Sequence, residues 1–193
     1  MTITKKEFEK LNAQLLDIKT PLVFADGFSV YNKFARRHVP HKKGFFILAP
    51  SGSGKTYFVD HQKEKHWVDG DILWKRTGAH PKGDWWHWGK EAIIETDQKS
   101  DIITIQAKKF GFWIIGASND FLIPDAIAIP PWNTHKKYIT SREARESFDG
   151  EGATSDGLEQ VKNHRKIILQ YTKQGVPKFD SIVEATDYLA SLC

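Results

Sequence analysis

The sequence predicts an α/β fold, in which a parallel sheet is flanked by helices in a three-layer arrangement. Short apolar runs that are typical of buried strands alternate with longer segments of helical pattern. Such alternation implies parallel strands joined by right-handed crossovers. The chain has 193 residues, of which 40% are hydrophobic and 27% charged, enough for one sizeable core. We expect this domain over residues 45–193, preceded by an N-terminal helical extension over residues 1–44.

The predicted extension opens with an amphipathic helix over residues 4–18. Thr4 and Glu7 fit a capping box, which satisfies backbone N–H groups at the start of a helix. Further along, the basic segment Tyr31–Lys43 has the composition of a phosphate or nucleic-acid contact, although a solvated face is the commoner role of such runs. Apolar side chains recur at helical spacing in the first segment, at Phe8, Leu11, Leu15 and Ile18.

The first predicted strand of the sheet leads into a glycine-rich loop. Phe45–Leu48 is short, apolar and followed by Ala-Pro, as in a buried strand of a parallel sheet. From Ala49 the spacing reads A-x-x-x-x-G-K-T, which matches the phosphate-binding P-loop except that Ala49 replaces the usual first glycine. Glycines in such a loop allow positive φ, so that successive N–H groups can point at one phosphate. The predicted nucleotide-binding residues are Ala49, Ser51, Gly52, Ser53, Gly54, Lys55 and Thr56.

Two side chains of this loop have specific roles in the predicted site. Lys55 would reach the β- and γ-phosphates of ATP, and the hydroxyl of Thr56 would bind Mg²⁺. The structural alternative is an ordinary Gly/Ser turn before a helix. Strand, loop, Lys-Thr and helical pattern follow one another in the order that a P-loop needs, which favours the nucleotide site.

A second short strand, Trp67-Val68, ends at two carboxylates, Asp69 and Asp71. Ligands of open parallel sheets lie beyond the carboxyl ends of the strands, so we expect both aspartates on the same rim as the loop. There, either carboxylate could bind Mg²⁺ or act catalytically by taking the proton of an acceptor hydroxyl. The structural alternative is a turn in which an aspartate caps the next helix.

The middle of the chain continues the alternation of helix and strand. Residues 89–110 have a mainly helical pattern with Ile102 and Ile105 inward, and Gly111–Asn119 and Asp125–Pro131 are predicted strands. A dense cluster of tryptophans precedes the helix. Such rings can stack nucleobases, but tryptophan is more often simply buried. The cluster consists of Trp85, Trp86 and Trp88.

The C-terminal part is predicted to be mainly helical. One helix runs from His135 to near Phe148, and a second begins after Ser155 or Asp156. A final amphipathic helix is expected over residues 179–192. The pattern indicates no clear fifth strand.

Charge and cysteine content narrow the class of protein. The formal net charge is +4 and the pI about 9.0, which suits anionic ligands but is modest for a dedicated nucleic-acid binder. The only cysteine, Cys193, excludes an internal disulfide and fits a reducing compartment. No apolar run approaches the roughly 20 residues that cross a membrane, and the N-terminus has no signal-peptide pattern. We therefore expect a soluble, cytoplasmic protein without a membrane partner.

The segment APSGSGKT, followed by VDGDIL, resembles the small P-loop kinases, the group that includes nucleotide, shikimate, gluconate and adenylylsulfate kinases. The resemblance covers residues 45–165 and implies phosphoryl transfer from ATP with the help of Mg²⁺. It also implies a lid over about residues 142–157, whose arginines clamp the phosphates. Arg142 and Arg145 occupy that place, and Arg165 would assist from the following helix.

The resemblance leaves the acceptor open. Members that phosphorylate hydroxyls carry Asp-x-Asp after the second strand, as in Asp69-Gly70-Asp71, whereas adenylate kinase-like members carry Gly-Asp, an apolar residue and Arg, which GDILWKR also fits. Many relatives place a metal-facing Asp after the third strand, but this chain has ASND, with Asp120 several residues late. The lid also lacks the Arg-rich opening of adenylate kinases.

Together these observations predict an ATP-dependent kinase with a nucleotide donor and a small acceptor, namely a nucleoside, a nucleotide or a sugar-like hydroxyl compound. The basic segment and the tryptophan cluster support an alternative, a kinase of a polynucleotide end or of a modified base in DNA, which would make nucleic acid a partner. From another class, a P-loop ATPase or nucleotide-binding switch would act without an acceptor. A non-catalytic module that only holds a nucleotide is the remaining alternative.

Overall fold

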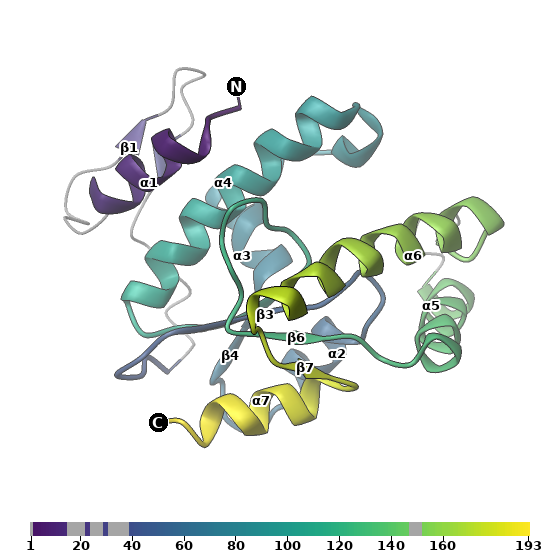
Figure 1. The fold of residues 1–193 in the computed structure, drawn as a ribbon. Coiled ribbons are helices and arrows are strands. Elements are labelled where there is room, and N and C mark those ends of the chain that lie inside the picture. The colour runs from purple at the N-terminus through teal and green to yellow at the C-terminus, as the bar shows by residue number, and fades with distance from the viewer. Residues whose placement is uncertain (1, 15–21, 24–28, 31–38, 147–151) are drawn as a thin grey trace. The chain divides into compact units, whose positions relative to one another are not determined.

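The computed structural model describes residues 2–14, 22–23, 29–30, 39–146 and 152–193 (Figure 1). Three expectations extend outside these residues: the end of the N-terminal helix after residue 14, most of the basic segment Tyr31–Lys43, and residues 147–151 within the candidate lid. The side chain of Arg145 also lies outside the described part, although its backbone belongs to a helix.

A five-stranded parallel sheet accompanied by helices confirms the predicted α/β class. The strand order is β4 (Trp67–Asp69), β5 (Trp113–Gly116), β3 (Phe45–Leu48), β6 (Ala126–Ala128) and β7 (Lys178–Phe179). β3 pairs with β6 so that Leu48 lies opposite Ile127. Every residue of β3, β4, β5 and β6 is buried, which explains why these strands are continuous apolar runs rather than alternating patterns.

The expectation that no fifth strand follows is wrong. β7 pairs in parallel with β6, with Phe179 opposite Ala128, and Ile129 N donates to the Phe179 carbonyl at 2.9 Å. A strand of two residues is too short to show a periodic pattern. Lys178 is also exposed and Phe179 half-buried, so the segment lacks the apolar run that reveals the inner strands.

The chain divides into two compact units. Unit 1 contains residues 1–45, 64–114 and 118–122, and unit 2 contains residues 46–63, 115–117 and 123–193. No helix in the described part of the chain is long and apolar enough to cross a membrane.

The long helix α4 (Lys90–Lys109) supplies the core of unit 1. Its residues 100–107 are all buried, including the predicted inward positions Ile102 and Ile105. The indole N–H of the fully buried Trp74 donates to Thr104 Oγ1 of α4 at 3.0 Å. The other elements of the unit are α1 (Lys5–Gln14), the antiparallel pair β1 (Leu22–Val23) and β2 (Ser29–Val30), α3 (Gly70–Thr77) and the 3₁₀ helix η1 (Trp85–His87).

The predicted start of helix α1 is confirmed. Thr4 N donates to Glu7 Oε2 at 2.7 Å, and Glu7 N donates to Thr4 Oγ1 at 3.3 Å, so the capping box is reciprocal. Ile3 N donates to the side-chain oxygen of Gln98 at 2.7 Å, and the Gln98 amide donates back to the Ile3 carbonyl at 3.0 Å. These two bonds attach the start of the chain to α4.

Two glycines of unit 1 lie where backbone segments cross. Gly111 follows α4 with a φ of +82°, and a Cβ there would lie 1.8 Å from the carbonyl oxygen of His41. A Cβ at Gly44 would lie 2.2 Å from the carbonyl oxygen of Lys108. A backbone hydrogen bond joins the two segments at the first crossing: His41 N donates to the Gly111 carbonyl at 2.8 Å. Neither crossing has room for a side chain.

Unit 2 contains helices α2 (Lys55–His61), α5 (Trp132–Glu146), α6 (Ser155–Leu169) and α7 (Ile182–Ala190), together with the 3₁₀ helix η2 (Gln170–Gln174). α5 begins three residues before the predicted His135, directly after Pro131, whose carbonyl accepts from His135 N at 2.9 Å. α6 begins near the predicted position, with Thr154 Oγ1 accepting from Gly157 N at 3.1 Å. The final helix is confirmed, with Ile182, Ala185 and Leu189 buried.

Candidate functional site

The glycine-rich loop of unit 2, Ala49–Thr56, joins β3 to α2. Ala49 N donates to the Gly116 carbonyl at 2.9 Å, which fixes the start of the loop to the end of β5. Gly52 and Gly54 both have positive φ, +74° and +93°. Both residues thus adopt the positive φ that the sequence predicted, a conformation that glycine adopts without steric cost.

The two glycines differ in their surroundings. A Cβ at Gly52 would lie 2.6 Å from Ile139 Cγ1 and 3.6 Å from His135 Nε2, whereas a Cβ at Gly54 would meet nothing within 4 Å. Helix α5 therefore packs directly against the loop at Gly52. At Gly54 the loop is open.

Polar groups collect inside the loop. The Lys55 side chain is only 5% exposed, and its Nζ donates to the Pro50 carbonyl at 3.2 Å. The same carbonyl accepts from Ser53 N at 3.3 Å. Ser53 Oγ is buried and has no hydrogen-bond partner within the described protein. A buried hydroxyl without a partner is costly, so this atom marks a place where an external acceptor would be stabilised. Thr56, the predicted Mg²⁺ ligand, is exposed at the start of α2.

A buried histidine connects the loop to α6. His135 of α5 is fully buried, its Nε2 lies 2.8 Å from the Ser51 carbonyl oxygen, and its Nδ1 lies 2.9 Å from Arg165 Nη1. A carbonyl only accepts and a guanidinium only donates, so Nε2 must carry the proton and Nδ1 must accept. The two partners thus define one neutral tautomer.

Burial and cationic neighbours keep this histidine neutral. Burial, together with the charges of Arg165, Lys55 and Arg142, lowers the pKa of His135 to about 4, against the opposing effect of the Ser51 carbonyl. His164 of α6 behaves in the same way: burial, Lys55 and His135 lower its pKa to about 4. Sequence reasoning missed both histidines, because neither belongs to a motif and their proximity to the loop depends on how α5 and α6 pack.

The predicted arginines have different surroundings. Arg165 donates to the Pro130 carbonyl at 2.8 Å as well as to His135, so its guanidinium is held at the end of β6. Arg142 Nη2 donates to Glu143 Oε1 at 2.9 Å, and the same arginine acts on the pKa of His135. The structure therefore brings Lys55, Arg142 and Arg165 into one electrostatic neighbourhood in unit 2.

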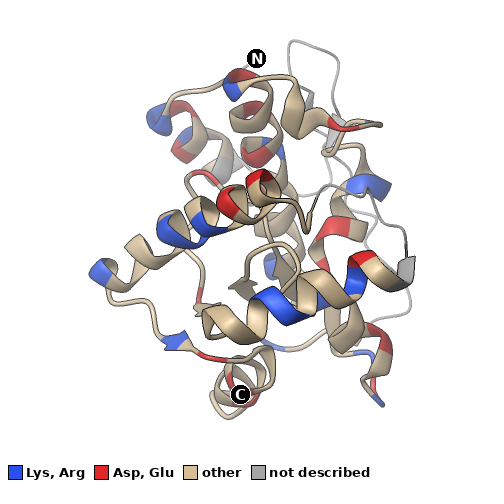
Figure 2. Cartoon of the chain, turned by 90° about the vertical axis from the view of Figure 1, so that its right-hand side faces the viewer, with Lys and Arg blue, Asp and Glu red and all other residues tan. Residues whose placement is uncertain are grey.

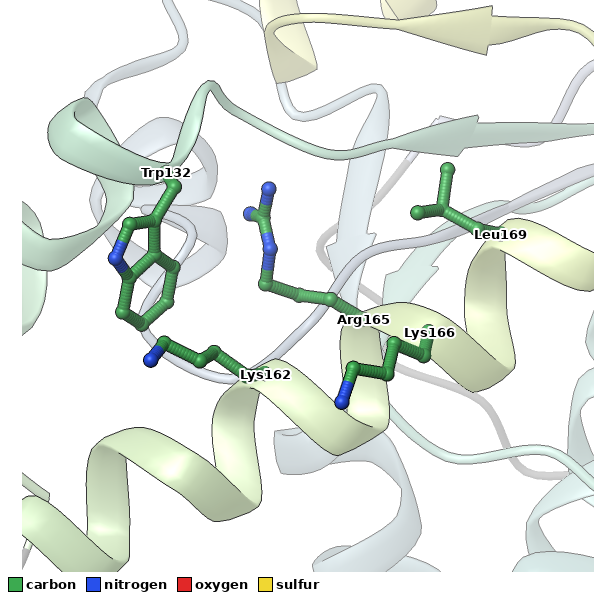
Figure 3. A pocket seen from close by; sticks show the side chains of 5 residues that line it. All are labelled: Trp132, Lys162, Arg165, Lys166 and Leu169. Atoms are coloured by element: carbon green, nitrogen blue, oxygen red, sulfur yellow. The ribbon is translucent and has the colours of Figure 1, made fainter.

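A pocket of about 210 Å³ opens beside Arg165 (Figure 3). Two cations lie over the ring of Trp132: Lys162 Nζ is 5.2 Å and Arg165 Cζ 5.6 Å from its centroid. Basic and acidic residues are interspersed along most of the chain (Figure 2), so this concentration of positive charge is local. The lining residues are Trp132, Lys162, Arg165, Lys166 and Leu169.

The two predicted aspartates belong to unit 1, where Asp69 caps α3. Its Oδ1 accepts from Asp71 N at 2.9 Å and from Ile72 N at 3.2 Å, and the residue is 2% exposed. This is the structural role that the sequence offered as the alternative for these residues. Asp71 is half-buried in the first turn of the same helix. Within the described residues, no three His, Cys, Asp or Glu side chains form a group that could hold a metal ion.

A buried acidic residue of α4 in unit 1, which holds the turn after β5, was also missed. Asp101 is fully buried, and its Oδ2 accepts from the backbone N of Asp120, Phe121 and Leu122 at 3.1, 2.7 and 3.0 Å. Burial raises the pKa of Asp101 to about 7, although these three bonds oppose the rise. The late position of Asp120 is therefore explained locally: it belongs to a turn that Asp101 holds.

The tryptophan cluster is partly structural. Trp85 is buried and its ring centroid lies 5.0 Å from that of His80, whose Nε2 is 3.1 Å from Ser100 Oγ of α4. Trp86 and Trp88 are 39% and 59% exposed. Trp85 thus anchors η1 in unit 1, and the other two rings are presented to the surroundings.

Comparison with models of protein families finds no match to this chain, and neither does comparison with curated proteins. The geometry of the glycine-rich loop and its neighbours is therefore what supports a function. Unit 2 combines an open loop of positive-φ glycines with a buried ammonium, an unpartnered hydroxyl and two arginines. This combination suits an anion of high charge, such as a polyphosphate.

Proposed function

We propose that the chain is an ATP-dependent phosphotransferase, in which the glycine-rich loop is a P-loop and the γ-phosphate passes to a small acceptor of the nucleoside, nucleotide or sugar-like hydroxyl class. The observation that carries the proposal is the unpartnered Ser53 hydroxyl inside a loop that also buries Lys55. Burying an ammonium and an unpartnered hydroxyl costs free energy, and a loop that served only as a turn would gain nothing in return.

The loop fits a polyphosphate in three respects. Positive φ at Gly52 and Gly54 suits backbone N–H groups that converge on one anion. The open space at Gly54 leaves room for a phosphate oxygen close to the backbone. Lys55 Nζ, which is held by the Pro50 carbonyl, can exchange this neutral acceptor for a charged one, a change that makes the hydrogen bond stronger.

ATP, the proposed phosphoryl donor, would bind together with Mg²⁺. Sites for Mg²⁺ usually combine one or two carboxylates with substrate phosphates and water rather than a complete cage of protein ligands. In unit 2, the Thr56 hydroxyl is the oxygen donor proposed for it. When bound, Mg²⁺ supplies charge neutralisation on the β- and γ-phosphates.

The chain's own residues then divide the remaining work. Lys55, Arg142 and Arg165 are proposed to stabilise negative charge on the phosphoryl group in flight, since phosphoryl transfer depends mainly on positioning and electrostatics. Asp71 or Asp69 is proposed to accept the proton of an acceptor hydroxyl. Asp69 already uses Oδ1 in the cap of α3, so Asp71 is the first candidate for the base.

The test is transfer of radiolabelled γ-phosphate from Mg-ATP to a panel of nucleosides, mononucleotides, sugars and 5′-hydroxyl oligonucleotides. Lys55→Ala should lower transfer by at least about 10²-fold, the typical cost of removing one group that stabilises transition-state charge. Lys63→Ala removes an exposed lysine of unit 2 beyond α2 and should leave transfer unchanged. Label that appears only as free phosphate would favour the ATPase alternative, and absence of ATP binding would overturn the proposal.

A further inference from the structure

We propose that the ring of Tyr57, with the ring of His61 stacked behind it, is a platform on which the nucleobase of the phosphoryl donor stacks. The pair is hereafter the Tyr57 platform. This inference rests on the proposed function and deepens it, because it gives a place to the base of a nucleoside triphosphate, whereas the glycine-rich loop holds only its phosphates. Both residues belong to α2 in unit 2, and Tyr57 directly follows the loop.

The Tyr57 ring is unusually accessible. Tyr57 is 65% exposed, more than any other large apolar or aromatic residue in the described part of the chain. Single exposed apolar residues are common on protein surfaces, so the position of the ring has to decide its role. What distinguishes Tyr57 is that it is the first residue after the loop.

The first turn of α2 brings Tyr57 to the open side of the loop. Phe58 N donates to the Gly54 carbonyl at 2.9 Å, so Gly54 takes part in this turn. Side chains of an α-helix lean toward its N-terminus and lie over the preceding turn. The Tyr57 ring is therefore inclined toward Gly54, where a Cβ would meet nothing within 4 Å. A base attached to phosphates on the loop has free space at this point.

His61 covers one face of the ring and holds it in place. The two ring centroids are 4.0 Å apart, and the ring planes are inclined by 24°. His61 Nδ1 lies 2.8 Å from the Tyr57 carbonyl, which can only accept, so Nδ1 carries the proton and the imidazole is fixed. The stack restricts rotation of Tyr57 and leaves its other face for one flat ligand. A ring held in this way loses less conformational entropy when a base binds.

The Tyr57 platform selects a class of donor rather than one base. Stacking on an aromatic side chain tolerates every nucleobase, because each base has a π-face. The platform should therefore favour any nucleoside triphosphate over a triphosphate that has no base, and by itself it does not separate ATP from GTP. An aromatic pair four residues apart also stabilises a helix, so the test has to measure binding as well as stability.

Binding is measured by titration calorimetry with ATP, GTP and ribose 5′-triphosphate, which keeps the sugar and the phosphates but lacks the base. Mg²⁺ is left out so that no transfer occurs during the titration. Tyr57→Ala should weaken binding of ATP and GTP roughly 5- to 150-fold, the range expected for one stacked base, and change that of ribose 5′-triphosphate less than about twofold. The unchanged affinity for ribose 5′-triphosphate would also show that the loop of the variant is intact.

Three further variants separate stacking from a general surface effect. Tyr57→Phe keeps the aromatic face and should restore the affinity for ATP and GTP. His61→Ala keeps the Tyr57 ring but removes its support, so its loss should be smaller than that of Tyr57→Ala. Tyr188→Ala is the matched control: Tyr188 is 40% exposed on α7 of unit 2 and also belongs to an aromatic pair, with its ring centroid 5.1 Å from that of Phe179. This control should leave all three affinities unchanged, and the thermal unfolding midpoint of each variant shows the effect on stability.

Three results would overturn the inference: equal affinity of the wild type for ATP and ribose 5′-triphosphate, equal losses for all three ligands in Tyr57→Ala, or equal losses for ATP in Tyr57→Ala and Tyr188→Ala. Failure of the proposed function is recognised separately. A wild type that prefers ATP to ribose 5′-triphosphate through Tyr57 but transfers no label would remove the phosphotransferase assignment while supporting the platform. A wild type that binds none of the three ligands would overturn both.

Discussion

His135 Nδ1 accepts a hydrogen bond from the Arg165 guanidinium across 2.9 Å, and this bond makes the histidine a connection between α6 and the glycine-rich loop. Nδ1 can accept from Arg165 only while it is unprotonated, and the neutral imidazole then carries its proton on Nε2, which donates to the Ser51 carbonyl. A change at either end is therefore transmitted to the other through the tautomer.

The two halves of the His135 connection can be tested by matched variants. His135→Gln keeps a donor at the position of Nε2, for Ser51, and His135→Asn keeps an acceptor at the position of Nδ1, for Arg165. Each variant leaves one buried partner unsatisfied and should cost about 1–3 kcal/mol in the free energy of unfolding, measured with urea. We expect His135→Gln to preserve ATP affinity better, and His135→Asn to preserve kcat better. Equal effects on ATP affinity and kcat in the two variants would show that His135 only fills space.

The contribution of His135 to the stability of the protein should fall as the pH drops from about 6.5 to about 4. The pKa of His135 is lowered to about 4 in the folded protein, whereas an unfolded histidine titrates near 6.5, so the unfolded chain binds more protons in this window. The contribution is fully present above about pH 6.5 and is lost toward pH 4. His135→Gln should reduce the slope of unfolding free energy against pH by up to about 1.36 kcal/mol per pH unit.

Asp101 provides the opposite slope and serves as the control. Its pKa is raised to about 7 in the folded protein, so the folded state binds more protons between about pH 4 and 7, and stability from this group falls as the pH rises. Asp101→Asn should therefore remove a destabilisation that grows toward pH 7, whereas His135→Gln acts on the acid side. If the pH profiles of the two variants change with the same sign, the assignment of these pKa shifts is wrong.

The two glycines of the loop should respond differently to alanine. Gly54→Ala meets only the conformational cost of positive φ, about 1–2 kcal/mol. Gly52→Ala adds a contact of 2.6 Å with Ile139 and should cost roughly 1–3 kcal/mol more from overpacking. The midpoint of thermal unfolding measures both. Combining Gly52→Ala with Ile139→Ala should recover part of the loss, and no recovery would argue against the packing of α5 on the loop.

Replacing Ser53 should affect ATP binding without lowering the stability of the protein. Because its buried hydroxyl has no partner in the described protein, Ser53→Ala should leave the unfolding midpoint unchanged or raise it slightly. If the hydroxyl donates to a phosphate, the same variant should weaken ATP binding roughly tenfold to a hundredfold, from about 1.5–3 kcal/mol for a hydrogen bond to a charged group. Ser191→Ala, at an exposed position of unit 2 after α7, is the matched control. A stability loss without an affinity loss would contradict the prediction.

The fold was predictable where the pattern is long or strongly apolar. Phe45–Leu48 and Trp113–Gly116 are buried on both faces, and a continuous apolar run shows this directly. The capping box of Thr4 and Glu7 is local, so its residue types suffice to predict it. β7 was not predictable, because its two residues are held by hydrogen bonds to a distant strand rather than by their own composition.

Only the part of the candidate site that is contiguous in the sequence was predictable. The loop from Ala49 to Thr56 is contiguous, so its spacing is visible in the sequence. His135 lies far from the loop in the chain and reaches Ser51 because α5 packs on Gly52, a relationship that no local pattern encodes. Asp69 shows the reverse case: its cap of α3 is local and was foreseen as the structural alternative, whereas any catalytic use of the Asp69 and Asp71 carboxylates stays a prediction.

The tight crossings at Gly44 and Gly111 have a consequence for how unit 1 opens. The segment before β3 cannot slide past the end of α4, because the backbone atoms are in contact where the two glycines lie. The His41 amide, bonded to Gly111, should therefore exchange its hydrogen with solvent only when a large part of the unit unfolds cooperatively. Amide exchange at His41 would thus report the global opening of unit 1 rather than the fraying of a loop.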